Sequence, residues 1–323
     1  MENMKLSVII VSYKSWGVLE NCLNSFNLYQ PKDTYEIIVV NNFPQDQEVD
    51  RFSKRHSKVK FINNSGNYGF SHACNLGAKN SIGKYLLFLN PDTELTSDNA
   101  IDSMIATLSK NHSIGIVSCR TINNIGKIER ELLFSNPWLL VASLRQIYKL
   151  IFGNVIRRRF KNSDNVWYPD WVSGSVLMIP KTLFDEIEGW NQTRFWMYHE
   201  DPDICNRVRN TGKEVALIRN KTIKHIGGGT SRTDIKTTVA AKTEVIISSH
   251  NYIQINTNKV EGIVLHMLFL SLNIFNLMIK SIFSLILLKP SKLLIYFGVI
   301  LNSIMYYLTS IYRLTWKSPR IKT

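Results

Sequence analysis

The sequence has little cysteine, and the few cysteines it has are widely separated. Only four occur in 323 residues, and none forms a CxxC pair. This spacing argues against a zinc ribbon and a disulfide framework, and it fits a reducing compartment. The amino-terminal run MENMKLSVIIVSY is too short for a signal peptide and lacks a small-residue cleavage site, so we expect it to form the first strand.

Acidic residues are outnumbered by basic ones. The 25 Asp and Glu residues face 39 Lys and Arg residues, which gives a formal net charge of +14. Such an excess suits nucleic acid or an anionic membrane only if the basic residues gather in one place. We find no nucleic-acid-binding motif and predict no nucleic-acid partner. The stretch 144–161, LRQIYKLIFGNVIRRRFK, fits either a solvated basic helix or a membrane-surface segment.

Long apolar runs are confined to the last quarter of the chain. Residues 262–288 contain only His266 and Lys280 as residues that can carry charge near neutral pH, and residues 293–312 contain none. At about 1.5 Å per residue, either run can cross a hydrocarbon core roughly 30 Å thick. We therefore predict a membrane-associated helical hairpin with a basic tail over residues 259–323. The alternative is a pair of soluble core helices.

Each predicted helix of the hairpin carries a narrow polar stripe, which we expect to face the other inside a bilayer or one leaflet. The basic residues of the tail outnumber the two lysines of the hairpin turn, which favours a cytoplasmic tail. The sequence thus predicts a location at the cytoplasmic face of the plasma membrane. The stripes are His266, Asn273, Asn276, Lys280 and Ser284, and Gly298, Asn302, Tyr306 and Thr309.

The first part of the chain predicts an α/β fold. Between residues 5 and 118, β-branched runs alternate with helical patterns, which is typical of a mostly parallel sheet with helices on both faces. After residue 167 the pattern predicts a strand at 171–179, a short helix at 181–187, a helix from about 202 to 211 and a strand at 214–218. We expect one domain over residues 1–258, with halves at 1–120 and 121–258.

Polar residues follow four of the predicted strands. Turn formation explains any one of these clusters, but parallel strands bring all four to one edge of the sheet, where ligands collect. The clusters are Ser12 and Tyr13, Asn41 and Asn42, Asn63 and Asn64, and Asn90 to Asp92.

Carboxylates at two points of the sequence are candidates for binding a cation or accepting a proton. Asp92 ends the apolar run in LFLNPDTEL, where it can form a turn or hold a ligand. Glu200 and Asp201 lie in MYHEDPDICNR, where Asp201 before Pro202 also suits a helix cap. His225 precedes a glycine run. A divalent cation held against a diphosphate would use one such carboxylate, and another would accept a proton from a hydroxyl.

These motifs resemble family 2 glycosyltransferases of the GT-A type, particularly the rhamnosyltransferase-like branch of bacterial surface-polysaccharide synthesis. The resemblance covers residues 5–232 and rests on motifs in family order. They are SVIIVSY, NYGFSHACNLG, LNPDTEL, the long segment from SGSVLMIPKTLFDEIEGW through MYHEDPDICNRVRNTGKEVALI, and KHIGGGTS.

The resemblance implies a role for each matching residue. Asp92 would bind Mg²⁺ or Mn²⁺ at the nucleotide diphosphate, with His225 as a further ligand or a phosphate contact. Asp201 would be the base, with Glu200 as its partner or stand-in. Trp190 and Trp196 would stack on acceptor sugars, with a core role as the alternative. The nucleotide sugar would be lined by Ser12, Tyr13, Asn41, Asn42, Asn67, Gly69, Asn75, Asp92 and Gly174.

Two positions depart from the family pattern. Asn41 stands where many relatives have an aspartate expected to read the nucleotide base, so the nucleotide preference is open. Asn90 replaces the first acid of the DxD motif, which weakens one ligand without removing the site.

The resemblance implies an inverting transfer of one sugar, for instance rhamnose, from a nucleotide-diphosphate donor to a lipid-linked or polysaccharide acceptor in O-antigen or capsule synthesis. The alternative is the same reaction with a different donor, such as a UDP-hexose. A sugar nucleotidyltransferase would require a glycine-rich basic loop after the first strand, and VSYKSWGVL is a poor version of one. A noncatalytic membrane partner that retains the fold is a further alternative.

Overall fold

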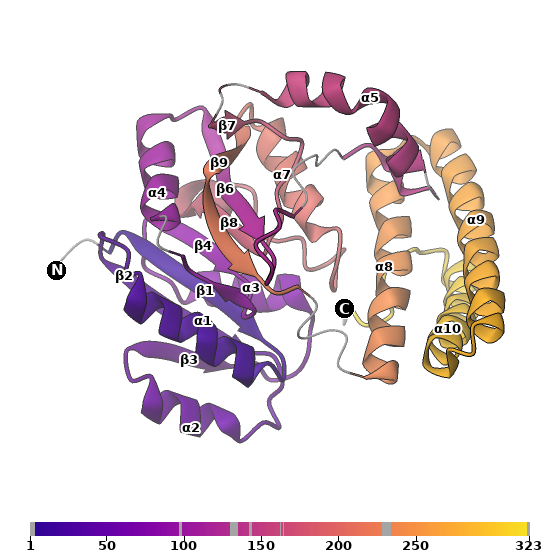
Figure 1. Ribbon diagram of the computed structural model, residues 1–323, viewed down its shortest axis with the longest axis horizontal. Helices are drawn as coiled ribbons and strands as arrows, with labels where there is room; N and C mark the ends of the chain where they lie inside the picture. The colour runs from indigo at the N-terminus through magenta and orange to yellow at the C-terminus, as the bar shows by residue number, and fades with distance from the viewer. Residues whose placement is uncertain are drawn as a thin grey trace. The chain divides into compact units, whose positions relative to one another are not determined.

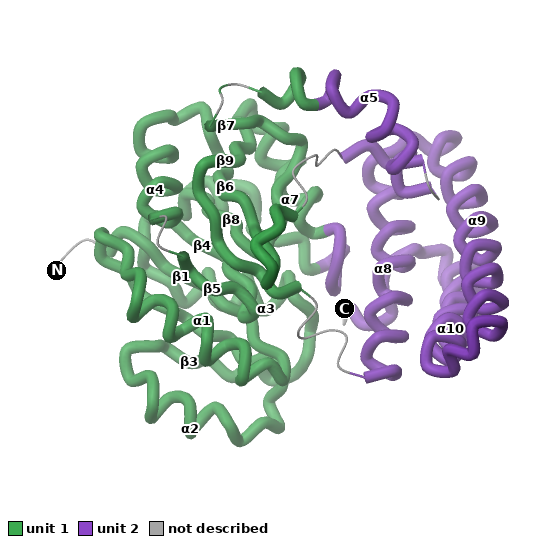
Figure 2. Tube along the Cα trace, in the orientation of Figure 1, with its two compact units in different colours: residues 1–134, 157–192, 200–230 green, residues 135–156, 193–199, 231–323 purple. Residues whose placement is uncertain are grey.

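The computed structural model describes residues 4–96, 99–129, 135–141, 144–161, 163, 165–227 and 234–321. By its internal contacts the chain divides into two compact units, which Figure 2 distinguishes by colour. Unit 1 comprises Met1–Phe134, Arg157–Gln192 and Glu200–Thr230, and unit 2 comprises Ser135–Ile156, Thr193–His199 and Ser231–Thr323. The division differs from the expected boundary at residue 258, because the last helix before the hairpin belongs with the hairpin.

Unit 1 begins with the predicted alternation of strands and helices (Figure 1). Its first elements are β1 (Leu6–Ser12), α1 (Trp16–Leu28), β2 (Tyr35–Asn41), α2 (Glu48–Arg55), β3 (Val59–Asn63), α3 (Phe70–Lys79), β4 (Tyr85–Leu89), β5 (Thr93–Glu94), α4 (Ala100–Lys110) and β6 (Ile114–Ile122). The later ones are β7 (Val166–Trp167), β8 (Val176–Pro180), α6 (Lys181–Glu186), α7 (Glu200–Asn210) and β9 (Glu214–His225).

The strands form one mixed sheet. Its order is β3-β2-β1-β4-β8-β6-β9-β5, and β7 pairs with β9 outside this path. Strands β1 to β4 are mutually parallel, whereas β8 runs antiparallel to both β4 and β6. The strand expected at 171–179 begins only at Val176, because a turn occupies the residues just before it. The expected α/β arrangement with helices around the sheet is confirmed. The sheet is uniformly parallel only through its first half, because β5, β7 and β8 pair antiparallel with their neighbours.

Helices cover both faces of this sheet. Helices α1 and α4 pack on one face, in the cluster that contains Phe26 and Met104. Helices α3, α6 and α7 pack on the other face, in the cluster that contains Phe88 and Trp190. Strands β1 and β4 are buried along their whole length, as uninterrupted apolar strands in the centre of a covered sheet must be.

Unit 2 is helical. It contains η1 (Pro137–Leu140), α8 (Ile235–Asn256), α9 (Lys259–Ile286), α10 (Pro290–Arg313) and most of α5 (Leu144–Phe160), which forms over the predicted basic stretch. Helix α10 packs against both α8 and α9 around an apolar cluster that includes Leu265 and Val299. Helices α9 and α10 are long and apolar enough to cross a membrane by length and composition, and about 28% of each apolar window is buried.

The two polar stripes of the hairpin do not satisfy each other, contrary to expectation. His266 pairs with His250 of α8, their Nδ1 atoms lying 2.8 Å apart. Asn273 and Thr309 instead hydrogen-bond to the backbone of their own helices, four residues back. The third helix, α8, supplies the polar partner that the sequence pattern assigned to the hairpin itself.

Gly83, which lies just before β4, packs directly against the backbone of β1. A Cβ atom at this position would lie 2.4 Å from the backbone nitrogen of Ser7 and 2.6 Å from the carbonyl carbon of Leu6. Because backbone atoms cannot move aside, we expect Gly83→Ala to lower the free energy of unfolding by about 2 kcal/mol in urea denaturation.

Gly17→Ala is the matched control for Gly83→Ala. Gly17 lies in the first turn of α1, and its Cβ would meet nothing within 4 Å. Helix propensity predicts a neutral effect or a gain of up to about 1 kcal/mol. Equal stability of the two variants would contradict the packing described for Gly83.

Candidate active site in unit 1

The polar residues at the strand ends meet at one edge of the sheet, as predicted. In the parallel register Ser12 is paired with Asn41, and Asn41 with Asn63. Strand β4 lies on the other side of β1, so Asn90 and Asp92 follow at the same edge. The structure thus brings together segments that are up to about 80 residues apart in the chain.

Asparagine side chains tie the loops of this edge together. Asn42 donates from Nδ2 to Asn67 Oδ1 at 3.0 Å and to the carbonyl oxygen of Gly69 at 3.3 Å. Asn64 donates to Asn42 Oδ1 at 2.9 Å. Gly69 has a φ of 95°, which favours glycine, and it precedes α3. The network therefore fixes the entry into α3 against the ends of β2 and β3.

Asn41 is fully buried, and protein groups occupy its amide. Its Nδ2 donates to Asn63 Oδ1 and to the carbonyl oxygen of Phe43, each at 3.0 Å, while its Oδ1 accepts from the Phe43 backbone at 3.1 Å. Base recognition by Asn41 requires these bonds to be exchanged. Ser12 is also fully buried and shares a hydrogen bond of 2.9 Å with Ser15. Tyr13 lies edge-on to Phe43.

Asn75 anchors the loop after α6. Its Oδ1 accepts from the Trp190 backbone nitrogen at 2.9 Å, and its Nδ2 donates to the Trp190 carbonyl oxygen at 2.8 Å. Gly189 turns the chain just before this clamp with a φ of 66°. In this structure Asn75 shapes the loop, and its contacts with a nucleotide stay a prediction.

The two tryptophans expected at an acceptor site are covered. Trp190 is 1% exposed and packs edge-on against Phe70 and Phe88, so its ring faces cannot stack on a sugar. Trp196 belongs to unit 2, where the guanidinium of Arg320 lies 4.6 Å from the centre of its ring. The core alternative holds for Trp190, and Trp196 is engaged by a cation instead of a sugar.

Asp92 and His225 are 133 positions apart in sequence and meet through strand pairing. Asn90 accepts hydrogen bonds from the backbone and hydroxyl of Thr93, so the predicted turn does form. Thr93 pairs with His225 in the β5–β9 register, and Ile226 donates to the carbonyl oxygen of Asp92 at 3.0 Å. As a result Asp92 Oδ1 lies 3.5 Å from His225 Nε2. The turn and the site are therefore the same structure.

Glu129 completes this cluster, and sequence reasoning missed it. Its Oε2 lies 3.0 Å from His225 Nδ1 and accepts from the hydroxyl of Thr121 at 2.8 Å. Burial alone would lower the pKa of His225, but the Asp92 and Glu129 carboxylates outweigh it and raise the pKa to about 9. Glu129 follows β6 in an irregular segment without a motif, so only the fold reveals its place.

The carboxylates at the start of α7 have different environments. Burial raises the pKa of Asp201 to about 6, although the Gly174 backbone donates a hydrogen bond to it and His225 lies near enough to act in the opposite direction. Asp201 is half-buried by surface exposure, whereas Glu200 is buried. A carboxylate with a pKa near neutrality is suited to accept a proton from a hydroxyl. Asp203 pairs with Arg207 at 2.8 Å and has a structural role.

Helix α7 starts earlier than the capping interpretation requires. The helix begins at Glu200, so Asp201 and Pro202 lie inside its first turn and Asp201 is not the residue before the helix. Tyr198 and His199, just before it, both adopt left-handed conformations with φ values of 71° and 63°. With these left-handed residues directly before the helix, the Asp201 side chain is not needed as its cap.

Gly174 is required by its contact with Asp201. A Cβ atom at residue 174 would lie 2.4 Å from Asp201 Oδ1. A cavity of about 30 Å³ is lined by residues that include Glu129, Ser173 and Ser175. Glu129 and the loop that carries Gly174 therefore border one space.

The donor atoms near Asp92 suit a divalent cation that shares its coordination with a ligand. Among the described residues there is no group of three or more His, Cys, Asp or Glu side chains placed to hold a metal. The Asp92 oxygen and the His225 nitrogen, 3.5 Å apart, can both reach one cation at about 2.1 Å. The pair therefore fits a Mg²⁺ or Mn²⁺ ion whose remaining ligands are phosphate oxygens and water.

The chain is similar in sequence to known proteins. Residues 7–165 match the family described as Glycosyl transferase family 2. The low-salt glycan biosynthesis hexosyltransferase Agl10 of Haloferax volcanii is 28% identical over 214 residues, which cover 63% of this chain and 61% of that protein. The rhamnosyltransferase WbbL of Escherichia coli K12 is 26% identical over 215 residues, covering 64% of this chain and 77% of WbbL.

A solved structure shares the fold. The mannosyltransferase PcManGT from Pyrobaculum calidifontis, in complex with GDP-Man and Mn²⁺, aligns with a TM-score of 0.56 at 12% identity. The alignment covers 93% of this chain and 87% of that one.

The clamp made by Asn75 provides a test of the site's loop geometry. Asn75→Ala removes both hydrogen bonds to the Trp190 backbone, so we expect amide hydrogen exchange in residues 188–192 to accelerate by about ten-fold. Asn80→Ala is the control, because the Asn80 side chain donates to the Leu76 carbonyl oxygen of α3 at 2.9 Å and not to the loop that follows α6. Unchanged exchange in the Asn75 variant would refute the clamp.

Proposed function

We propose that this chain, which matches the family 2 glycosyltransferase model over residues 7–165, moves one sugar from a nucleotide-diphosphate donor to an acceptor hydroxyl with inversion. The observation that carries this proposal is the β5–β9 pairing, which sets Asp92 3.5 Å from His225 at the ligand-binding edge of the sheet. A diphosphate is the group that such a pair can hold through a shared cation.

Asp201 would serve as the base. In one displacement, the acceptor oxygen forms a bond to the anomeric carbon while the bond from that carbon to the diphosphate oxygen breaks. The bonding electrons leave with the nucleoside diphosphate, and the hydroxyl proton passes to the Asp201 carboxylate. The hydrogen bond from the Gly174 backbone holds that carboxylate in place. Glu200, buried beside it, supports or replaces it.

The cation would be held by Asp92 and His225. When bound, it neutralises charge that develops on the departing diphosphate. Glu129 orients the His225 ring through Nδ1, as partners of metal-bound histidines commonly do. Mg²⁺ and Mn²⁺ both suit a carboxylate oxygen, and the imidazole nitrogen favours Mn²⁺.

The acceptor would be a lipid-linked or polysaccharide hydroxyl in cell-surface glycan synthesis, O-antigen or capsule for example. The names of the relatives support this proposal, since they describe glycan biosynthesis and, for WbbL, rhamnosyl transfer. Rhamnose is thus the first donor sugar to test, and a UDP-hexose is the second. A noncatalytic partner that retains the fold is the alternative to both.

Membrane association supports a lipid-linked acceptor. Helices α9 and α10 keep large apolar side chains exposed, among them Phe275 and Leu308. Helix α5 exposes Leu150 and Ile151 together with its terminal arginines, as a membrane-surface segment does. We place unit 2 at the cytoplasmic face of the plasma membrane, where nucleotide sugars are available.

The decisive assay uses membranes that contain the protein, a panel of nucleotide sugars, Mg²⁺ or Mn²⁺ and an extract of lipid-linked acceptors. We expect acceptor-dependent release of nucleoside diphosphate from one donor, and its loss in Asp92→Ala and Asp201→Asn. Removing a general base costs about 10²–10⁴-fold in rate. No release from any donor by the folded protein would favour the noncatalytic partner.

Gly174→Ala tests the position of the base. The added methyl group would displace the Asp201 carboxylate, because the two would lie 2.4 Å apart. A displacement of this order costs about 10²-fold, so kcat should fall while donor KM changes little. Gly17→Ala, whose methyl group enters open space, should keep the full rate. A Gly174→Ala enzyme with an unchanged kcat would exclude Asp201 as the base.

A further inference from the structure

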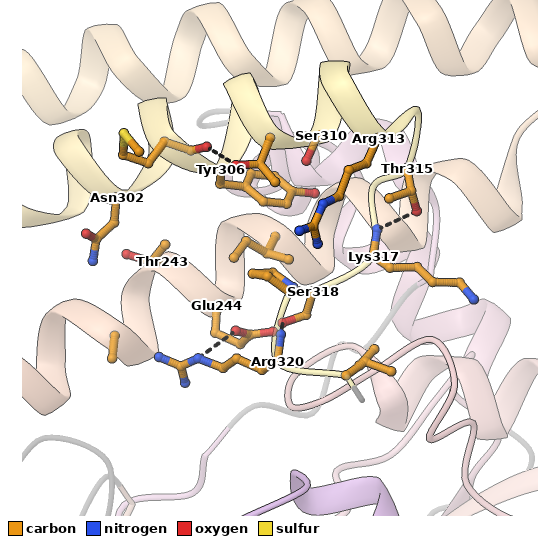
Figure 3. Close-up of a pocket in the computed structure, with 16 residues that line it drawn as sticks. Thr243, Glu244, Asn302, Tyr306, Ser310, Arg313, Thr315, Lys317, Ser318 and Arg320 are labelled. Atoms are coloured by element: carbon orange, nitrogen blue, oxygen red, sulfur yellow. Dashed lines mark hydrogen bonds and ion pairs between the residues drawn. The ribbon is translucent and has the colours of Figure 1, made fainter. Parts of the chain in front are cut away.

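Unit 2 contains a cavity of about 420 Å³ that none of the proposed chemistry uses. It lies among α8, the second half of α10 and the carboxy-terminal tail (Figure 3). Its volume falls within the range of small-molecule sites. The cavity is therefore large enough for a ligand of its own.

One face of α10 forms a polar wall of this cavity. Asn302, Tyr306, Ser310 and Arg313 are spaced four, four and three positions apart, so they lie on one side of the helix (Figure 3). Asn302 and Tyr306 belong to the polar stripe of α10, which we expected to face the polar stripe of α9. In the structure these two residues line the cavity instead.

Lys317 and Arg313 both line the cavity without an ion pair among the described residues, and the Lys317 side chain extends away from Arg313 (Figure 3). Arg313 is the cation that faces the cavity. It lies in the last turn of α10 and has no ion-pair partner among the residues that the structure describes. Figure 3 shows its guanidinium directed into the space between the helices and the tail. By contrast, Arg320 lies 3.7 Å from Glu244 Oε2 and over the Trp196 ring, so its charge is already engaged.

Glu244 lies opposite on α8 and does not cancel this positive charge. It is 1% exposed, and its Oε1 has no hydrogen-bond partner among the described residues. Burial raises the pKa of Glu244 to about 7, against the opposing effects of Ser318 and Arg320. Arg320 already pairs with the Glu244 carboxylate, so the positive charge of Arg313 is left for a ligand.

The cavity adjoins apolar surface on the same helix. Met305 lines the cavity and is 63% exposed, while Leu301 and Leu308 are 48% and 60% exposed. A ligand with an anionic head and an apolar chain would contact the polar cavity with its head and the apolar side chains of α10 with its chain. A small water-soluble anion would contact only the cavity.

We propose that this cavity binds the phosphate headgroup of a membrane lipid, with Arg313 as its principal cation and the chain of the lipid along α10. The inference rests on the membrane association contained in the proposed function. Two lipid sources share this chemistry, the diphosphate of a lipid-linked acceptor and the phosphate of an anionic phospholipid.

The test measures binding of the full-length protein to nanodiscs of phosphatidylcholine, alone or with a small fraction of polyprenyl diphosphate or phosphatidylglycerol. We expect a phosphate-bearing lipid to strengthen binding and Arg313→Gln to weaken that gain about ten-fold, since a charge-assisted hydrogen bond is lost. Arg313→Lys should retain most of it. The lipid that gives the larger gain identifies the source.

Lys292→Gln is the matched control, because it removes one positive charge from the first turn of α10, at the end away from the cavity. Equal losses in the Lys292 and Arg313 variants would overturn the proposal, as they would reveal only general attraction to anionic surfaces. The proposal would also be overturned if inorganic diphosphate bound the protein as tightly as the phosphate-bearing lipid, because the apolar chain would then contribute nothing.

The failure of this proposal and that of the proposed function give different results. Protein that does not bind phosphatidylcholine nanodiscs lacks the membrane association, which counts against both. Protein that transfers sugar with Asp201 intact, but shows no dependence of lipid binding on Arg313, keeps its function and loses the headgroup site. Arg313-dependent binding without any transfer keeps the site and removes the function.

Discussion

The pairing of β5 with β9 is the contact on which the candidate active site depends. It spans two residues, yet it places Thr93 opposite His225 and so brings the turn after β4 to the end of the longest strand. The Asp92–His225 pair and the contact with Glu129 both follow from this register. A shift of one residue would turn these side chains to opposite faces of the sheet.

The carboxylates of unit 1 differ in their environments and therefore in their proposed roles. The Asp92 and Glu129 carboxylates flank His225 and raise its pKa to about 9, so a cation held at this sheet edge would take the place of the proton on Nε2. Burial moves the pKa of Asp201 toward neutrality, although the Gly174 backbone donates a hydrogen bond to it. Residues of the same type thus acquire the properties of a ligand and of a base from their environments.

Unit 2 shows how a polar pattern can be satisfied in more than one way. His266 and Tyr307 both contact His250 of α8, whose Nδ1 lies 2.8 Å from His266 Nδ1 and whose Nε2 lies 3.1 Å from the Tyr307 hydroxyl. The indole of Trp316 stacks on both histidines. Buried polar groups of this kind need partners, and here a third helix provides them while the outer faces of α9 and α10 stay apolar.

The sequence by itself determined the local elements and the class of site. Apolar runs and turn residues located β1 to β4, α3 and the two apolar helices, since these depend on hydrophobic period and on nearby residues. The polar strand ends had to meet because parallel strands share an edge. Asp92, Asp201 and His225 could be named because each lies in a recognisable motif.

Only the tertiary structure decided which of these residues touch. Glu129 has no local signal and enters the site through the fold of the segment after β6. Trp190 could not be assigned to core or ligand from sequence, because exposure depends on packing by Phe70 and Phe88. The antiparallel place of β8, the engagement of Asn41 and the role of α8 all arise from contacts between distant segments, which periodicity does not encode.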